Sequence, residues 1–291
     1  MSTRTPSANF MNLFDSPILR IETVPMILPP DLHMHTPLCR HATGEPVDYA
    51  RRAIELGLKE IGFSDHSPMR QDDFDDWRMR FDQLSEYVEN VRRAQKEFPQ
   101  LTIRLALEVD YLPGHEDWIR ELSGLHDWDY LIGSVHYVSD SWAIDNPHMI
   151  SEWSKRNPAE VWSVYFERLT MAAETGLFQI IGHVDLPKKF GHRIPSSAEN
   201  LVGPFLQAAR RRHCAIELNT AGLRKDCREI YPHGDILRAA LREGVPITFG
   251  SDAHAATEVG MDFGKALSLA KEVGFTHGLS FEQRQARSFK L

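Results

Sequence analysis

Histidines and carboxylates follow short apolar runs at six places along the chain. The first run, DLHMH, ends in His33 and His35, and a spacing of two residues puts both imidazoles on the same side of an extended strand. The other runs end in Asp65 and His66, Glu108 and Asp110, His136, His183 and Asp185, and Asp252 and His254. Imidazole nitrogens and carboxylate oxygens are ligands of zinc, manganese and iron. This pattern therefore predicts a metal centre.

The chain offers more donors than one ion can bind. With His41 from the loop after the first run, the candidate metal ligands are His33, His35, His41, His66, Glu108, His136, His183, Asp252 and His254. A carboxylate such as Glu108 can bridge two ions that lie about 4 Å apart. We therefore expect two or three divalent ions, with zinc, manganese or iron favoured over calcium or magnesium alone. Cys39 is not expected to bind metal, since a thiolate would be redundant among these donors.

Other polar residues near these runs allow two interpretations each. Asp65, Asp110 and Asp185 either orient the neighbouring imidazoles or cap turns. The acidic run DDFDDW at 72–77 is expected to be a solvated loop, with a cover over the site entrance as the alternative. Neither choice changes the predicted metal ligands.

The elements that must position these residues alternate between short apolar runs and longer segments of helical pattern. Strands are expected at 31–35, 59–63, 102–109, 129–137, 178–182, 214–219 and 246–250. Helices are expected at 46–57, 80–97, 116–123, 158–175, 197–212, 233–243 and 262–273, several of which end at a glycine. The alternation is typical of a parallel sheet or barrel, in which the carboxyl ends of the strands lie on one face. We expect the candidate ligands to meet at that face.

Composition limits the partners and the number of domains. The 291 residues are 42% hydrophobic and carry a formal net charge of -8, so an overall basic surface for nucleic acid or anionic membrane is not expected. No apolar run approaches the roughly 20 residues that span a bilayer. Three cysteines without paired spacing favour a reducing cytoplasm. We expect a cytoplasmic protein with an N-terminal extension over 1–30 and one domain over 31–291; the oligomeric state stays open.

Seven segments together resemble the polymerase and histidinol phosphatase (PHP) superfamily, and most closely its histidinol-phosphate phosphatases. They are DLHMHTPLCRHATGEP, IGFSDHSP, ALEVDY, GSVHYV, IGHVDLPKKFG, ELNTAGLRK and TFGSDAH. The resemblance spans roughly residues 31–275. It implies an α/β fold, a distorted (β/α)₇ barrel with a centre of three metal ions. It also implies hydrolysis of a small phosphate monoester, with L-histidinol phosphate in histidine biosynthesis as the leading substrate.

The same resemblance implies a role for each candidate residue. A first ion would be bound by His33, His35, Glu108 and Asp252; a second by Glu108, His136 and His183; a third by His41, His66 and His254. Arg224 and Arg193 are the candidates to bind phosphate, since a guanidinium matches its oxygens, and Asn219 is the candidate to place the substrate.

The expected mechanism is an in-line attack on phosphorus by a hydroxide held between two ions, with Asp65 or His254 as candidate proton donor to the leaving alkoxide. Three other functions remain open. A PHP phosphoesterase acting on nucleic acid or another phosphate is disfavoured by the negative net charge. A metal-dependent amidohydrolase usually has a bridging lysine at a strand end, and no expected strand here ends in lysine. A non-catalytic zinc protein would have a closed site with four ligands.

Overall fold

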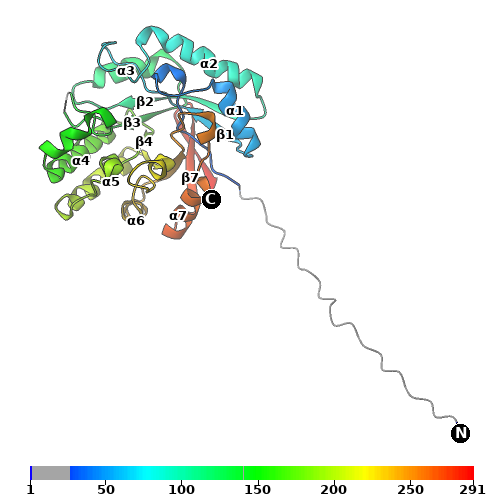
Figure 1. The fold of residues 1–291 in the computed structure, drawn as a ribbon. Coiled ribbons are helices and arrows are strands. Elements are labelled where there is room, and N and C mark those ends of the chain that lie inside the picture. The colour runs from blue at the N-terminus through cyan, green and yellow to red at the C-terminus, as the bar shows by residue number, and fades with distance from the viewer. Residues whose placement is uncertain (2–26, 140) are drawn as a thin grey trace.

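The core of the protein is a curled parallel sheet surrounded by helices (Figure 1). The computed structural model describes residues 1, 27–139 and 141–291, and only the backbone of 197–199. Six parallel strands follow one another in chain order across the sheet: β1 (Glu60–Phe63), β2 (Thr102–Asp110), β3 (Tyr130–Ser134), β4 (Ile180–Ile181), β5 (Ala215–Asn219) and β6 (Ile247–Gly250). The parallel β/α architecture predicted from the sequence is confirmed.

The segment at 31–35, expected as the first strand, lies between the two edges of this sheet. It forms isolated parallel bridges, from Asp31 to Ile61 beside β1 and from Met34 to Ala253 beyond β6. The amide of Leu32 donates to the carbonyl of Phe249 at 3.0 Å, so the backbone alternates between the two neighbours. Because the backbone alternates in this way, the segment pairs with too few consecutive residues of either neighbour to form a regular β-ladder. The chain still passes between β1 and β6 and carries His33 and His35 into the interior.

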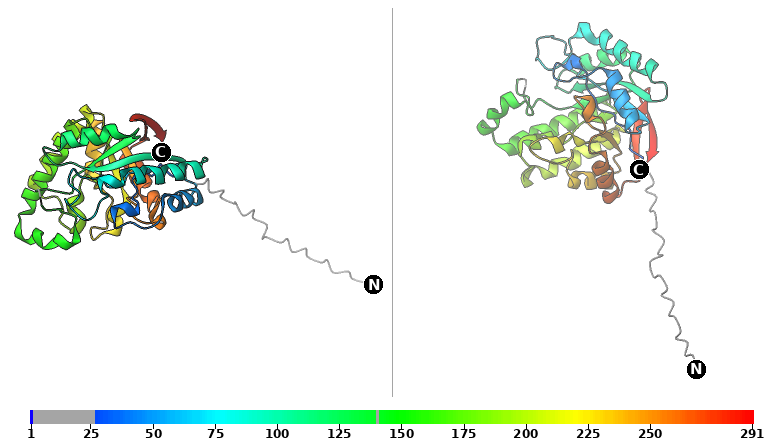
Figure 2. Two further views of the ribbon diagram at one scale, coloured as in Figure 1. Left: turned by 90° about the horizontal axis from the view of Figure 1, so that it is seen from above. Right: turned by 45° about the vertical axis from the view of Figure 1, so that its right-hand side comes forward.

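In the described part of the chain, seven α-helices are present. Figure 2 shows helices packed on the outside of the sheet. The seven helices are α1 (Pro46–Glu55), α2 (Leu84–Glu97), α3 (Glu116–Leu125), α4 (Pro158–Glu174), α5 (Val202–Arg211), α6 (Gly234–Glu243) and α7 (Phe263–Val273). Asn157 is the N-cap of helix α4, because its side chain accepts a hydrogen bond from the backbone amide of Ala159. Pro158 occupies the first turn, where no backbone N–H is needed. Helix α6 ends at Gly244, whose φ of 72° is the left-handed conformation that glycine adopts without strain.

Several 3₁₀ helices and a terminal hairpin were not predicted from the sequence. The longest 3₁₀ helix in the described part of the chain, Pro147–Lys155, lies between β3 and α4. At the end of the chain, β7 (His277–Glu282) and β8 (Gln285–Lys290) form an antiparallel hairpin, red in Figure 2, and β7 contacts β6. Its Phe281 is 2% exposed and packs with Leu32 and Tyr130 among the side chains inside the sheet. The hairpin therefore covers part of the core that the β/α units leave open.

The remaining expectations concern the N-terminus and membranes. Most of the predicted extension lies outside the described residues; of its last part, Pro29 is buried and Leu28 packs against the core. Among the described helices, none has the length and apolar character needed to cross a membrane.

Candidate metal centre

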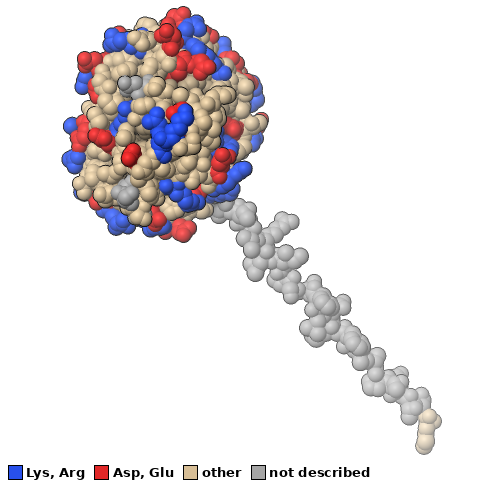
Figure 3. Space-filling view, turned by 60° about the vertical axis from the view of Figure 1, so that its left-hand side comes forward, with Lys and Arg blue, Asp and Glu red and all other residues tan. Residues whose placement is uncertain are grey.

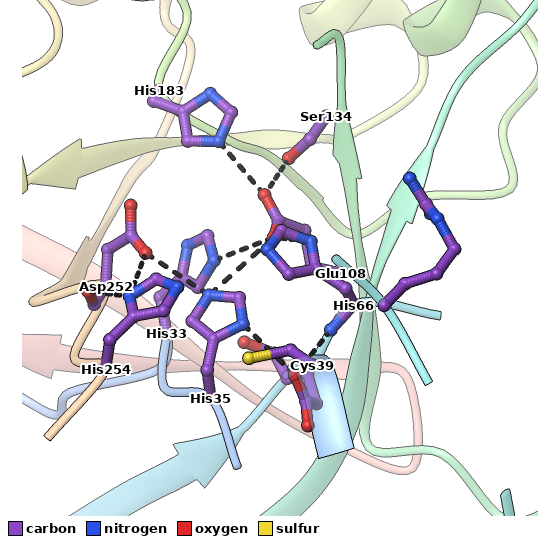
Figure 4. A network of polar contacts seen from close by, with 12 residues as sticks. His33, His35, Cys39, His66, Glu108, Ser134, His183, Asp252 and His254 are labelled. Carbon is purple, nitrogen blue, oxygen red and sulfur yellow. Dashed lines mark hydrogen bonds and ion pairs between the residues drawn. The ribbon is translucent and has the colours of Figure 1, made fainter. Parts of the chain in front are cut away.

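The candidate ligands lie together at the carboxyl end of the parallel strands, as expected. Glu108 comes from the last part of β2, while the others stand on the segment at 31–35 and in loops that follow the strands. Figure 4 shows imidazoles from distant parts of the chain pointing toward one another around Glu108. The inner ligands are buried, and Asp252, His254 and His41 are partly or fully exposed on the outer side. The centre is therefore deep on one side and open on the other.

Glu108 occupies the middle of the cluster, and its two carboxylate oxygens face different groups. Oε1 is 3.0 Å from Nε2 of His183 and 3.7 Å from Nε2 of His136. Oε2 is 2.9 Å from Nδ1 of His66, 3.4 Å from Nε2 of His33 and 3.7 Å from Nε2 of His35. Oε1 thus faces the predicted ligands of the second ion, while Oε2 faces His33 and His35, predicted for the first ion, and also His66, predicted for the third. This is the geometry that a bridging carboxylate requires.

Three carboxylates outside the cluster fix the orientation of its imidazoles. Asp65 Oδ1 is 3.2 Å from Nδ1 of His35, and Asp110 Oδ1 is 2.7 Å from Nδ1 of His136. In each case the Nδ1 side faces a carboxylate and leaves Nε2 for the centre, which is the arrangement of histidines that ligate metal. Of the two interpretations for Asp65 and Asp110, the structure supports the orienting role.

The third of these carboxylates, Glu217 on β5, was not predicted from the sequence. Its Oε1 is 2.7 Å from Nδ1 of His33, and its Oε2 accepts from the backbone amide of His183 at 3.0 Å. The side chain is 1% exposed. The available signal was a single acidic residue inside the apolar strand CAIELN, because a carboxylate is rarely buried without partners.

Asp185, the remaining acidic residue with two interpretations, contacts Lys188 and the His233 amide and none of the imidazoles of the cluster.

The histidine pair at the open side tests whether these residues fit a cation. Nδ1 of His41 lies 2.8 Å from the carbonyl oxygen of Cys39, and Nδ1 of His254 lies 3.0 Å from that of Asp252. Both Nδ1 atoms must therefore donate, which leaves both Nε2 atoms as acceptors, and these lie only 2.9 Å apart. Two lone pairs at this distance repel unless a proton or a cation lies between them. Burial and the neighbouring His35 hold the pKa of His254 well below its usual value, which disfavours the proton.

Buried polar atoms that form no hydrogen bond within the described part of the chain mark the inside of the cluster in the same way. Buried atoms for which the described residues offer no hydrogen bond include His33 Nε2, His35 Nε2, His66 Nδ1 and Glu108 Oε2. Such atoms are costly in a protein interior, and their convergence on one point is accounted for by cations. Burial would raise the pKa of Glu108, but the surrounding His66, His33 and His136 hold it well below its usual range. The carboxylate is thus ionised and ready to bind metal.

The donor atoms that lie close together form groups that overlap with the three expected ligand sets, with Asp252 absent from the first group. Ligand atoms of His33, His35 and Glu108 lie within 4.8 Å of one another, and so do those of Glu108, His136 and His183. At the third place, His254 groups with His35 and His66 and also with Cys39 and His41. Burial raises the pKa of the Cys39 thiol far above its usual value, so the group is a neutral thiol in the described surroundings.

A cavity of about 490 Å³ opens onto the exposed side of the cluster. Its walls carry both signs of charge, with Arg40, Lys189 and Lys225 on the one hand and Asp76, Asp145 and Glu258 on the other. Figure 3 shows one face of the molecule, on which Lys and Arg side chains gather near the centre while acidic side chains are scattered around them. Positive side chains thus gather on part of this face, although the chain has a net charge of -8.

The predicted substrate-binding residues occupy different positions. Arg224 donates to the carbonyls of Ser251 and Asp252, at 2.8 and 3.2 Å, and so holds the loop after β6. Asn219 is buried, and its Nδ2 donates to Asp252 Oδ2 at 3.2 Å. Arg193 is 69% exposed, pairs with Glu229 and does not line the cavity. The structure therefore brings Arg224 and Asn219 to the metal centre but not Arg193.

The two predicted proton donors also differ. Asp65 is fully buried, and both of its oxygens are engaged, Oδ1 by His35 and the His66 amide and Oδ2 by Thr36. His254 lines the cavity and can reach a bound molecule.

In the acidic run at 72–77, Asp72, Asp73 and Asp76 are exposed as expected. Trp77, in contrast, lines the cavity beside His66, and the centroids of the two rings are 4.7 Å apart.

A parallel β/α fold with a His- and carboxylate-lined centre at its strand ends defines a class of metal-dependent hydrolases. The family model of the PHP domain matches residues 31–221. A probable histidinol-phosphatase of Deinococcus radiodurans is 43% identical over 245 residues, which cover 84% of this chain and 93% of the relative. The histidinol-phosphatase of Bacillus subtilis is 30% identical, with 79% and 95% covered.

Solved structures show the same fold. A histidinol phosphate phosphatase of Lactococcus lactis, solved with zinc, L-histidinol and phosphate, superimposes with a TM-score of 0.76 at 22% identity and covers 90% of this chain and 100% of its own. The chain belongs to the PHP domain family and, within it, to the histidinol-phosphatases.

Proposed function

We propose that this protein is a metal-dependent phosphatase that hydrolyses L-histidinol phosphate to L-histidinol and phosphate. The observation that carries the proposal is the convergence of nine imidazole and carboxylate groups, with Glu108 in their middle, at the floor of a cavity of about 490 Å³. The histidinol-phosphatase relatives, which this chain matches over nearly their full length, support the choice of substrate. The reaction would supply the free amino alcohol in histidine biosynthesis, in the cytoplasm.

The metal ligands that we propose are the nine predicted ones, divided among three ions as the family resemblance implies. The donors are nitrogen and oxygen, which favours zinc, manganese or iron. Bound divalent ions would supply a water molecule that ionises near neutral pH and would neutralise charge on the phosphoryl oxygens. Cys39 stays outside the ligand set, since Cys39 is fully buried and its thiol remains protonated in these surroundings.

The chain's own residues hold this centre rigid and leave one side open for the substrate. Glu108 keeps the two inner ligand groups in a fixed relation, and the carboxylates of Asp65, Asp110 and Glu217 keep the imidazoles turned inward. Lys189 and Lys225 in the cavity wall would attract the phosphate, while carboxylates in the same wall suit the ammonium group of histidinol phosphate. Neither predicted proton donor suits the leaving alcohol, because both oxygens of Asp65 are engaged and His254 is a proposed metal ligand whose pKa is held well below its usual value. A bound ion would stabilise the leaving alkoxide instead.

The cavity favours a phosphatase over an amidohydrolase. Glu108 holds the central position in which an amidohydrolase would have a bridging lysine. Of the two lysines that line the cavity, Lys189 is bound to Asp145 in the loop after β4, and Lys225 follows the 3₁₀ helix after β5. Phosphate release from L-histidinol phosphate, compared with hydrolysis of single-stranded oligonucleotide and of N-acyl amino acids, tests the proposal. Turnover of the last two without phosphate release would refute it.

A further inference from the structure

Arg78 is a buried arginine that lies outside the predicted metal ligands but is connected to one of them. Its Nη2 donates to Asp110 Oδ2 at 2.8 Å, and the other oxygen of Asp110 is 2.7 Å from Nδ1 of His136. The side chains of Arg78 and Asp110 are 3% and 1% exposed. A chain of charged groups thus runs from Arg78 through Asp110 to an imidazole whose Nε2 faces Glu108.

The same guanidinium also fixes the loop that forms one wall of the cavity. Its Nε lies 2.9 and 2.8 Å from the two oxygens of Asp75, and its Nη2 lies 2.6 Å from Asp75 Oδ2. Tyr137 donates to that oxygen at 2.8 Å. The guanidinium carbon is 4.3 Å from the centre of the Trp77 ring, which stacks on Tyr137. Trp77 is in turn edge-on to His66 and His136.

We propose that Arg78 is a positioning residue that sets His136 in the metal centre and Trp77 in the substrate cavity at the same time. With Oδ2 held by Arg78, the Asp110 carboxylate cannot rotate away from His136, so Nε2 of the imidazole stays directed inward. With both oxygens of Asp75 held, the loop that carries Trp77 stays against the cavity. The part of the proposal that concerns substrate rests on the proposed function, whereas the part that concerns metal does not.

The type of residue matters for this role. A guanidinium presents several donors in a rigid plane and can bind two carboxylates at once, while a lysine ammonium is a single point of charge on a flexible stem. Arg78 uses this capacity fully, since Nη1 also donates to the carbonyl of Ser67 at 3.2 Å. Arg78→Lys therefore keeps the charge and should lose the simultaneous grip on Asp75 and Asp110.

Arg78 has two connections, one through Asp110 to His136 and one through Asp75 to the loop that carries Trp77, and four variants separate them. Asp110→Asn alters the connection to His136, Asp75→Asn alters the connection to Trp77, and Arg78→Lys alters both. Arg80→Lys is the matched control, because Arg80 lies two residues away, is exposed and pairs with the exposed Asp82. For each protein, zinc affinity is measured by titrating the metal-free form in competition with a chromophoric chelator, and KM and kcat are measured with L-histidinol phosphate. Far-ultraviolet circular dichroism checks folding.

We expect Asp110→Asn to lose zinc affinity by about 10- to 100-fold at one site with little change in KM. Asp75→Asn should raise KM at wild-type zinc affinity, Arg78→Lys should show both effects, and Arg80→Lys neither. Folded Arg78→Lys with wild-type affinity and KM would overturn the proposal. So would wild-type zinc affinity in Asp110→Asn or wild-type KM in Asp75→Asn, even if Arg78→Lys does not fold. If the wild-type protein fails to hydrolyse L-histidinol phosphate, the proposed function is wrong, and the zinc titrations alone decide the role of Arg78.

Discussion

Nδ1 of His33 lies 2.7 Å from Oε1 of Glu217, a contact between two side chains that are 184 residues apart in the sequence. It joins the segment that closes the sheet to β5, and the other oxygen of Glu217 holds the backbone amide of His183. The close approach requires Gly250, because a Cβ atom at that position would lie 2.0 Å from Glu217 Oε1. One buried carboxylate therefore positions predicted ligands of two different ions.

Glu217→Gln is expected to weaken the metal centre without removing any ligand. A glutamine keeps the shape but loses the charge that makes His33 a stronger donor, so metal affinity or activity should fall by about 10- to 100-fold. Metal content after dialysis and phosphate release measure the effect. Glu272→Gln, an exposed position on α7, is the matched control and should behave as wild type. Equal metal retention in the two variants would show that Glu217 has no positioning role.

Glu108→Gln tests the bridging role directly. An amide has only one oxygen to offer and no charge, while Glu108 presents its two oxygens to two groups of imidazoles. We expect metal content and phosphatase activity to be lost together. Metal analysis by mass spectrometry and an assay of the same sample give both values. Full activity in a variant that retains its metal would refute the bridge.

The pair of Lys189 and Asp145, 2.9 Å apart in the cavity wall, makes a prediction about pH. Burial opposes ionisation of Asp145, but Lys189 and His136 hold its pKa at about 2, below the usual 3.8. A lowered pKa in the folded state means that Asp145 stabilises the fold above pH 4 and that this contribution is lost as the pH falls toward 2.

Lys189→Met should therefore destabilise the protein by about 2 kcal/mol at pH 7, where Asp145 is left ionised without its partner. The difference from wild type should shrink at pH 4, because Asp145 then takes up a proton more readily in the variant. Urea unfolding at both pH values measures the change. Lys265→Met is the control, since Lys265 is 67% exposed and its pair with Asp262 contributes little. A pH-independent difference would contradict the assignment.

The C-terminal hairpin is expected to contribute to stability through Phe281. This side chain is 2% exposed and packs with Leu32 and Tyr130 inside the sheet. Phe281→Ala should cost about 3–5 kcal/mol, as truncation of a buried phenylalanine does. Phe81→Ala, at a position that is 43% exposed, should cost clearly less. Similar thermal midpoints for the two variants would mean that the hairpin does not complete the core.

Much of the site could be predicted because its ligands follow the strands in a regular pattern. The HxH spacing of His33 and His35 and the repeated β/α alternation were enough to place the predicted ligands at one face. Glu217 was missed because it stands within an apolar strand and its partner His33 is far away in the sequence. Arg193 was chosen from its motif alone, and the structure instead places Lys189 in the cavity wall.

The remaining differences have similar causes. The hairpin at β7 and β8 follows the last β/α unit, so the alternation that predicted the other strands gave no signal for it. In the acidic run at 72–77, Asp72, Asp73 and Asp76 are exposed as expected, but Asp75 is held by Arg78, which follows directly after the run. Contacts between a loop and a buried partner on another strand depend on the tertiary fold and leave no periodic trace in the sequence.

The central claim is tested most directly by phosphate release from L-histidinol phosphate before chelation, after chelation and after zinc, manganese or iron is restored, with p-nitrophenyl phosphate assayed in parallel. The account predicts rapid hydrolysis of L-histidinol phosphate, little hydrolysis of the aryl ester, loss of activity on chelation and recovery with at least one of the three metals. Undiminished activity in protein shown to be metal-free would contradict it, and so would inactivity toward L-histidinol phosphate in protein shown to contain metal.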